Sequence, residues 1–246
     1  MTVLDPPGLP VGADLQGWTP RELPPRRVLR GHYARLEPLS AANHVVSLHE
    51  AFSRKPADSN WTYLPYGPFA SEEAFAAWVE GVEPLEDPHF YAVVDERSGQ
   101  AGGVASYLRM QPEVGVIEVG HLNFSPRLQR TIAATEAMYL MMRQVFDDLG
   151  YRRYEWKCDS LNAASMTAAR RLGFRYEGIF RQATVYKGRN RDTAWFSIID
   201  SEWPDLRDAF EIWLAPENFT RTGTQRRGLA EIASEGDRGV GRGVED

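Results

Sequence analysis

The sequence contains very little cysteine. Cys158 is the only cysteine in 246 residues, so an intramolecular disulfide is excluded. Its position gives no cluster of cysteine and histidine with the spacing of metal ligands, and we expect no metal site. We interpret Cys158 as structural, because a thiol nucleophile needs an activating partner and the sequence assigns none to it.

An excess of positive charge is also missing. The chain has 28 Lys and Arg against 34 Asp and Glu, which gives a formal net charge of -6 and an isoelectric point near 5.5. A general nucleic-acid or anionic-membrane binder normally presents a basic surface. We therefore expect neither nucleic acid nor a membrane as a partner.

Long apolar runs are absent as well. The first residues, MTVLDPPGLPVGADL, have neither the basic n-region nor the apolar h-region of a signal peptide. No stretch has the length and apolar character of a bilayer span. We expect a cytoplasmic protein, in which the sequons at Asn60 and Asn218 are accidental matches.

Hydrophobic and aromatic residues are plentiful, at 43% and 11% of the chain, which is enough for one substantial core. Proline and glycine are frequent in residues 1–26, which we expect to form an extended N-terminal segment. We expect residues 217–246 to form a polar C-terminal tail. The body between them, residues 27–216, is predicted to be a single domain.

The hydrophobic periodicity of the body alternates between the period of strands and that of helices. Strands are predicted at 32–39, 115–124 and 152–158, a strand, turn and strand at 89–110, and a long hairpin at 176–203 with its turn in 187–192. Helices are predicted at 43–52, 71–82, 131–149, 162–172 and 204–214. This mixed order implies an α/β layer structure with helices on both faces of one sheet.

One short helix follows directly after Cys158. Asn162 is a good N-cap residue for this helix, and Gly173 suits the position just past the last helical residue. Between them, apolar residues at i, i+4 and i+8 form a stripe along one face. Taken alone, this stretch predicts only a helix, and most helices of this kind are scaffolding.

Several segments, in their order and spacing, resemble the GNAT acyltransferases, and within them the Rim-type ribosomal-protein N-acetyltransferases. The segments are RLEPL at 35–39, EVGHLNF at 118–124, ATEA at 134–137, LNAASMTAARRLGF at 161–174, YEGIFRQ at 176–182 and KGRNRDTAWFSIIDSEW at 187–203. The resemblance implies the GNAT fold, with a mixed, largely antiparallel sheet that splays between the strands of Glu118 and Lys157. Acetyl-CoA would bind in that gap, and Asn162 with its helix would form one wall.

The same resemblance implies that the N-terminus of the helix at 131–149 holds the diphosphate of acetyl-CoA, since free backbone N–H groups there favour an anion. The glycines that the family normally has in the preceding loop are absent; their positions hold Arg130 and Ile132, or Gln129 and Thr131. Arg127 and Arg130 could replace them with charge-assisted bonds to phosphate, or both could be solvated. The expected cofactor contacts are Leu122, Asn123, Phe124, Arg127, Gln129, Arg130, Thr131, Ile132, Ala133, Asn162 and Ser165.

Glu118 is the candidate general base, because the Rim-type enzymes often have a catalytic glutamate at this position and partial burial could raise its pKa. The alternative is a carboxylate on a strand face that is paired with an arginine. His121 is an alternative base or a substrate contact. Backbone N–H groups near Leu122 to Phe124 could bind the thioester carbonyl if a bulge interrupts strand pairing there.

The proton that returns to the leaving thiolate needs a second group. Many GNAT members use a tyrosine, but the matching position is Ala169. Some Rim-type enzymes instead have a serine three residues after the asparagine, and Ser165 stands there. Its hydroxyl can relay a proton or hydrogen-bond the leaving sulfur; the alternative is a small residue that allows close helix packing.

The acceptor site is expected among Trp61, Tyr63, Tyr66 and His121, although aromatic residues in a chain with seven tryptophans are more often core. The expected function is acetyl transfer from acetyl-CoA to a primary amine, a protein N-terminus or a small molecule, by direct transfer in a ternary complex. The alternative is a non-catalytic acyl-CoA-binding module. The family resemblance also implies a two-fold homodimer, for which the exposed strands and the long hairpin at 176–200 offer a surface.

Overall fold

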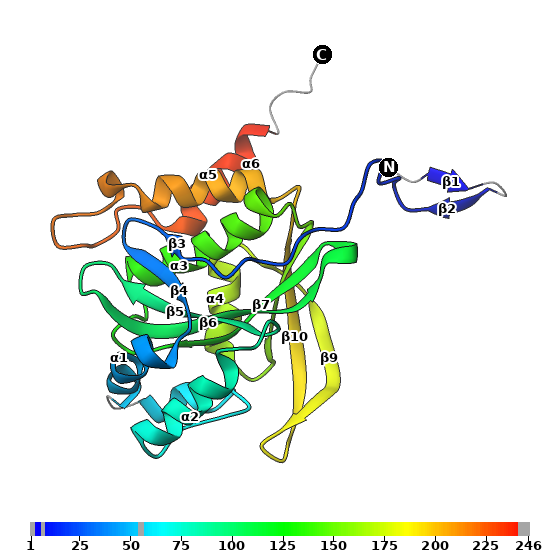
Figure 1. Ribbon diagram of the computed structural model, residues 1–246. Coiled ribbons are helices and arrows are strands. Elements are labelled where there is room, and N and C mark those ends of the chain that lie inside the picture. The colour runs from blue at the N-terminus through cyan, green and yellow to red at the C-terminus, as the bar shows by residue number, and fades with distance from the viewer. Residues whose placement is uncertain (1–2, 6–7, 54–56, 241–246) are drawn as a thin grey trace.

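The centre of the computed structural model is a twisted sheet with helices on both faces (Figure 1). The structure describes residues 3–5, 8–53 and 57–240. In these residues the sheet has eight strands in the order β3-β4-β5-β6-β7-β8-β10-β9. The strands are β3 (Leu29–Arg30), β4 (Ala34–Pro38), β5 (His89–Asp95), β6 (Gln100–Gln111), β7 (Val116–Phe124), β8 (Arg153–Asp159), β9 (Arg175–Tyr186) and β10 (Arg189–Ile199).

Only one pair of neighbouring strands in this sheet is parallel. β7 and β8 run in the same direction, connected through the helix α3 (Ile132–Arg143) and its π-helical continuation η3 (Gln144–Asp148), whereas the other neighbours are antiparallel. The predicted mixed, largely antiparallel sheet is therefore confirmed, including the meander β5-β6-β7.

Two cores lie on opposite faces of the sheet. The larger one packs α3, α4 (Ala163–Arg171) and α5 (Trp203–Leu214) against one face, and ten of the twelve α3 side chains are buried in it. The smaller one packs α1 (Ala41–Ser53) and α2 (Glu72–Val82) against the other face. The helices α1 and α2 cover only the sheet half near β4, β5 and β6, and no helix of the described residues covers the other half of this face (Figure 1).

The neighbouring strands β7 and β8 separate partway along their length. They pair from Val116 opposite Arg153 to Val119 opposite Trp156, and β7 then continues to Phe124 beside β6 only. Between Gly120 and Asn123 the β7 strand has one extra residue relative to β6, and His121 there has a φ of 51°. A residue added in this way bends the strand and leaves backbone groups unpaired. The splay that the family resemblance implied is present, and so is the bulge on which the predicted N–H groups near Leu122 to Phe124 depended.

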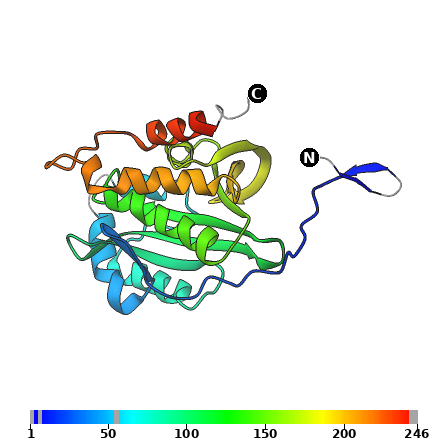
Figure 2. The ribbon, with the colours of Figure 1, turned by 90° about the horizontal axis from the view of Figure 1, so that it is seen from above.

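The ends of the chain differ in how they attach to the body. The hairpin of β1 (Val3–Asp5) and β2 (Leu9–Val11) stands away from the body, and an extended segment joins the two (Figures 1 and 2). At the other end, α6 (Leu229–Val240) packs on α5 with Leu229 and Ile232 buried. This packed helix corrects the expectation that residues 217–246 form only a polar tail.

The remaining elements are short. They are the 3-10 turns η1 (Ala57–Trp61), η2 (Pro112–Val114) and η4 (Pro216–Asn218). The turn of the long hairpin is formed by Lys187 and Gly188, which both have positive φ, as two-residue hairpin turns require. None of the helices in the described part of the chain is both long and apolar enough to cross a membrane.

Candidate active site

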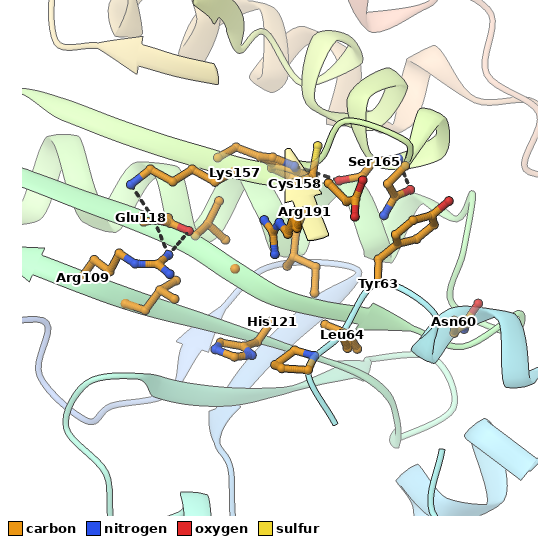
Figure 3. Close-up of a pocket in the computed structure, with 18 residues that line it drawn as sticks. Asn60, Tyr63, Leu64, Arg109, Glu118, His121, Lys157, Cys158, Ser165 and Arg191 are labelled. Atoms are coloured by element: carbon orange, nitrogen blue, oxygen red, sulfur yellow. Dashed lines mark hydrogen bonds and ion pairs between the residues drawn. The ribbon is translucent and has the colours of Figure 1, made fainter. Parts of the chain in front are cut away.

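A cavity of about 180 Å³ opens where β7 and β8 separate (Figure 3). Its walls come from residues 108–109 of β6, 118–122 of β7 and 156–159 of β8, the start of α4, Asn60 of η1, residues 63–65 of the loop after η1, and Arg191 of β10. The loop and the hairpin are tied to the rest of the site, since the Tyr63 hydroxyl donates to the Leu161 carbonyl at 3.1 Å and Lys187 Nζ to the Trp61 carbonyl at 2.7 Å.

Glu118 lies at one side of this cavity and is 2% exposed. Its carboxylate accepts from Arg109 Nη1, at 2.7 Å to Oε1 and 2.8 Å to Oε2, and Lys157 Nζ lies 2.9 Å from Oε2. Lys157 is also 2.7 Å from Glu155 Oε2 and 3.8 Å from the centre of the Trp195 ring. Glu118 thus has the ion-paired arrangement that was its alternative interpretation, and two cations fix its carboxylate beside the gap.

Ser165 lies across the gap, one turn into α4. Its hydroxyl oxygen accepts from Trp156 Nε1 at 2.9 Å, and its backbone N–H donates to Asn162 Oδ1 at 3.0 Å. The predicted N-cap is therefore confirmed, and both Asn162 and Ser165 line the cavity. Because the tryptophan N–H occupies one lone pair of the serine oxygen, the hydroxyl proton is directed elsewhere. Ala169, at the position where many family members have tyrosine, is completely buried.

Cys158 also lines the cavity, but as a thiol rather than a thiolate. Burial raises its pKa, and a hydrogen bond with Ser165 and the charge of Arg191 only partly oppose this effect. A nucleophilic cysteine needs the opposite shift. The structure thus gives no support for a catalytic thiol.

His121 occupies the bulge of β7. Its Nδ1 lies 3.0 Å from the Tyr66 hydroxyl, and the two rings stack with their centroids 5.6 Å apart. Burial, together with the charges of Arg109 and Arg191, lowers the pKa of His121 to about 4, so the imidazole is neutral at pH 7. Burial likewise raises the pKa of Tyr66 well above its usual value, so the phenol keeps its proton.

The start of α3 lies beyond the cavity. Thr131 caps the helix, with its hydroxyl oxygen accepting from the Ala134 N–H at 3.1 Å. The N–H groups of Ile132 and Ala133 belong to the first helical turn and have no acceptor among the described residues. Arg130, with a φ of 60°, is exposed beside them, whereas Arg127 Nη2 donates to the Ala101 carbonyl at 2.9 Å.

The other predicted cofactor residues divide between cavity and surroundings. Leu122 lines the cavity, Asn123 is buried with neither side-chain amide atom hydrogen-bonded among the described residues, and the Phe124 carbonyl accepts from Asn60 and Gln129. Only Leu122, Asn162 and Ser165 of the predicted cofactor set therefore face the cavity itself.

The predicted acceptor residues are only partly brought together. Tyr63 and His121 line the cavity, and Tyr66 supports His121 from behind. Trp61 is 3% exposed and packs in the smaller core against Phe52 and Phe69, which corrects its assignment to the acceptor site.

The sequence reasoning missed three cationic residues of the site. Arg109, Lys157 and Arg191 come from β6, β8 and β10, and all line the cavity. The only signal for them in the sequence was the alternation of side chains along each strand, which does not show what lies opposite. The structure places Lys157 opposite Trp195 in the β8–β10 pair. Within the described residues, no three His, Cys, Asp or Glu side chains lie close enough to hold a metal ion.

Comparison with known proteins identifies the fold and the family. Residues 34–175 match the family described as acetyltransferase (GNAT) domain. A GCN5-related N-acetyltransferase from Brucella melitensis is 49% identical, with 89% of this chain and all of that chain covered and a TM-score of 0.88. The uncharacterized N-acetyltransferase YnaD of Bacillus subtilis (strain 168) is 24% identical over 148 residues, 60% of this chain and 85% of that protein.

A more distant structure bears on the Rim-type resemblance. It is the acetyl transferase from Salmonella typhimurium that modifies the N-terminal serine of the 50S ribosomal subunit protein L7/L12. It is 21% identical, covers 70% of this chain and 99% of its own, and has a TM-score of 0.60, which shows a shared fold. Together with the family match over residues 34–175, these similarities show that the chain belongs to the GNAT acetyltransferases and is an acyltransferase.

Proposed function

We propose that the chain is a cytoplasmic N-acetyltransferase that transfers the acetyl group of acetyl-CoA directly to a primary amine, in a ternary complex. The observation that carries this proposal is the separation of β7 and β8 after Val119 and Trp156, with a polar cavity at the point where they part. The acceptor is a protein N-terminus or a small molecule. The fold shared with an enzyme that modifies an N-terminal serine supports the first of these.

The residues around the gap fit an acyl-CoA. Beyond Val119, β7 pairs with no strand on its β8 side among the described residues, so we assign backbone groups between Gly120 and Asn123 to an extended pantetheine arm. The N–H groups of Ile132 and Ala133, with exposed Arg130, suit the diphosphate. When bound, the donor supplies an activated thioester carbonyl. The bulge at His121 and Leu122 interrupts the β6–β7 register, and we assign backbone N–H groups there to polarising that carbonyl.

Glu118 is proposed to take the proton of the attacking amine, directly or through one water. Arg109 and Lys157 hold its carboxylate in a single position at the cavity wall, which favours a defined geometry for proton transfer. The neutral imidazole of His121 faces the same cavity and is the alternative base. The two are distinguished by substitution of Glu118.

Ser165 is proposed to assist the departing thiolate. Its oxygen accepts from Trp156 Nε1 and its hydroxyl is hydrogen-bonded with Cys158, so donation to the leaving sulfur requires the hydroxyl to turn from Cys158 toward the bound donor. A hydroxyl is too weak an acid to ionise, so its part is a hydrogen bond or a relay from water.

A thiol-release assay tests the function. The protein is mixed with acetyl-CoA and a panel of amines and peptides with free N-termini, and acetyl-CoA binding is measured in parallel by calorimetry. We expect binding together with amine-dependent release of CoA. Binding without turnover across a broad panel would instead favour the non-catalytic module.

A two-fold dimer is proposed through the edge of the sheet. β9 is the last strand in the sheet order, and it presents Phe180 and Val185 at 55% and 73% exposure. An exposed, partly apolar edge strand is a common site of association. Light scattering that gives only a monomer at high concentration would end this proposal.

A further inference from the structure

Arg191 occupies an unusual place in the cavity wall. It follows the hairpin turn on β10, where the register against β9 shifts between Arg191 and Thr193. The tip of this hairpin is anchored, because Lys187 Nζ donates to the Trp61 carbonyl. The Arg191 side chain is half-buried and lines the cavity together with Tyr63 and Cys158 (Figure 3).

Within the residues that the structure describes, the Arg191 guanidinium has no hydrogen-bonding or ion-pair partner. Its Nε is buried and unpaired, and the guanidinium lies over the Tyr186 ring, with Cζ 5.9 Å from the ring centre. A guanidinium withdrawn from water without acceptors costs free energy that a bound anion would recover.

The carboxylates around Arg191 are engaged by other groups. Asp159 accepts from the Leu161 N–H and the Tyr186 hydroxyl, and Asp192 accepts from the Gln182 N–H and from Asn190. Glu118, on the opposite wall, is held by two cations.

The charge of the lining as a whole is positive. Three cationic side chains, Arg109, Lys157 and Arg191, face two anionic ones, Glu118 and Asp159. After burial, the charges of Arg109 and Arg191 are the next causes of the lowered pKa of His121, which indicates that Arg191 acts across the cavity. Such an environment attracts an anion and also favours the neutral, nucleophilic form of a bound amine.

We propose that Arg191 binds a carboxylate on the acceptor, so that the enzyme selects amines that carry a carboxylate close to the reacting nitrogen. An amino acid, or a peptide whose second residue is acidic, has this chemistry. The planar guanidinium can bind a carboxylate through two parallel hydrogen bonds. The inference rests on the proposed function, and it assigns the anion to the acceptor because the start of α3, which suits the donor diphosphate, lies outside the cavity that Arg191 lines.

The test compares acceptors that differ only in the anion. One pair is β-alanine and β-alaninamide, and the other is two C-terminally amidated peptides with aspartate or asparagine as the second residue. Phosphoethanolamine is the phosphate arm. Wild type is compared with Arg191→Gln, with Arg191→Lys and with Arg189→Gln, an exposed control on the same strand. Each protein is first checked for its melting temperature, and acceptor binding to the CoA-saturated protein is measured as well as turnover.

We expect wild type and Arg189→Gln to favour the carboxylate in at least one pair by about ten- to hundredfold in kcat/KM or in affinity. Arg191→Gln should lose this preference through the acceptor KM, with the KM for acetyl-CoA unchanged, and Arg191→Lys should keep part of it.

Equal use of acid and amide by wild type would overturn the inference while leaving amine acetylation intact. A preference that survives Arg191→Gln would also overturn it, as would a raised KM for acetyl-CoA alone, which would assign Arg191 to the donor. Selection of phosphoethanolamine over both carboxylates would replace the carboxylate with a phosphate. Absence of turnover with every amine contradicts the proposed function, and the binding data then decide the role of Arg191 separately.

Discussion

Replacing Glu118 with glutamine separates its proposed role as a base from its role in the charge network. The amide keeps the shape of the side chain but has one acceptor oxygen and no charge. Arg109 Nη1 can keep at most one of its contacts of 2.7 and 2.8 Å, but its side chain is 59% exposed and water can replace what is lost. Lys157 keeps Glu155 at 2.7 Å.

These contacts place the cost in stability below that of breaking a fully buried ion pair. We expect Glu118→Gln to lower the free energy of unfolding by about 1–3 kcal/mol, the cost of weakened charged hydrogen bonds, rather than ~3–5 kcal/mol. The expected loss in kcat is larger, roughly 10²- to 10⁴-fold, because a general base contributes that much. The acidic limb of the kcat/KM profile should disappear.

Glu155→Gln is the matched control. Glu155 is 6% exposed, pairs with the same Lys157 and with Arg153, and does not line the cavity. It should reduce stability by a similar amount and leave kcat within a few-fold of wild type. Ser165→Ala should lower kcat less than Glu118→Gln, since water can take over part of the relay. If Glu155→Gln lost as much activity as Glu118→Gln, or if Glu118→Gln kept its kcat and its acidic limb, Glu118 would not be the base.

Three further predictions concern the donor site, the fold and pH. Arg130→Ala should weaken acetyl-CoA binding, whereas Arg127→Ala should change it less because Arg127 already donates to the Ala101 carbonyl. The affinity of wild type should also fall as salt rises, and calorimetry at two salt concentrations measures both effects. Glu136→Gln should cost about 2–5 kcal/mol in denaturant unfolding, because this buried carboxylate accepts three backbone N–H bonds at 2.6 to 2.9 Å; a cost below ~1 kcal/mol would contradict that account. His121 has its pKa lowered from 6.5 to about 4 in the folded protein, so the unfolded chain binds the proton first and stability should fall as the pH drops from about 6.5 toward 4; His121→Asn should make the denaturation midpoint less sensitive to pH in that window.

Local patterns predicted the secondary structure of the body well. The helix α4 follows from Asn162 as its N-cap and from Gly173, whose φ of 91° places it just past the helix end. The hairpin β9–β10 follows from two alternating runs around Lys187 and Gly188. These signals are short-range, so a single sequence contains them.

Long-range pairing was not readable in the same way. The helix α6 was missed because Leu229 and Ile232 stand in a stretch rich in glycine and charge, and they are buried only by packing on α5. The gap between β7 and β8 came from the family resemblance, since no local pattern states where two strands stop pairing. The cations that pair with Glu118 cannot be read from a single sequence, and neither can the lack of a carboxylate partner for Arg191 among the described residues. Both depend on how the fold brings four strands together.

The most direct test of the central claim is amide hydrogen exchange with and without acetyl-CoA. We propose that the donor lies in the gap beyond Val119 and at the start of α3. Binding should therefore slow exchange in residues 119–124 and 130–134, and leave β4 and β5 unchanged. Acetyl-CoA that binds without protecting these segments, or that protects a different part of the sheet, would contradict the assignment of the active site.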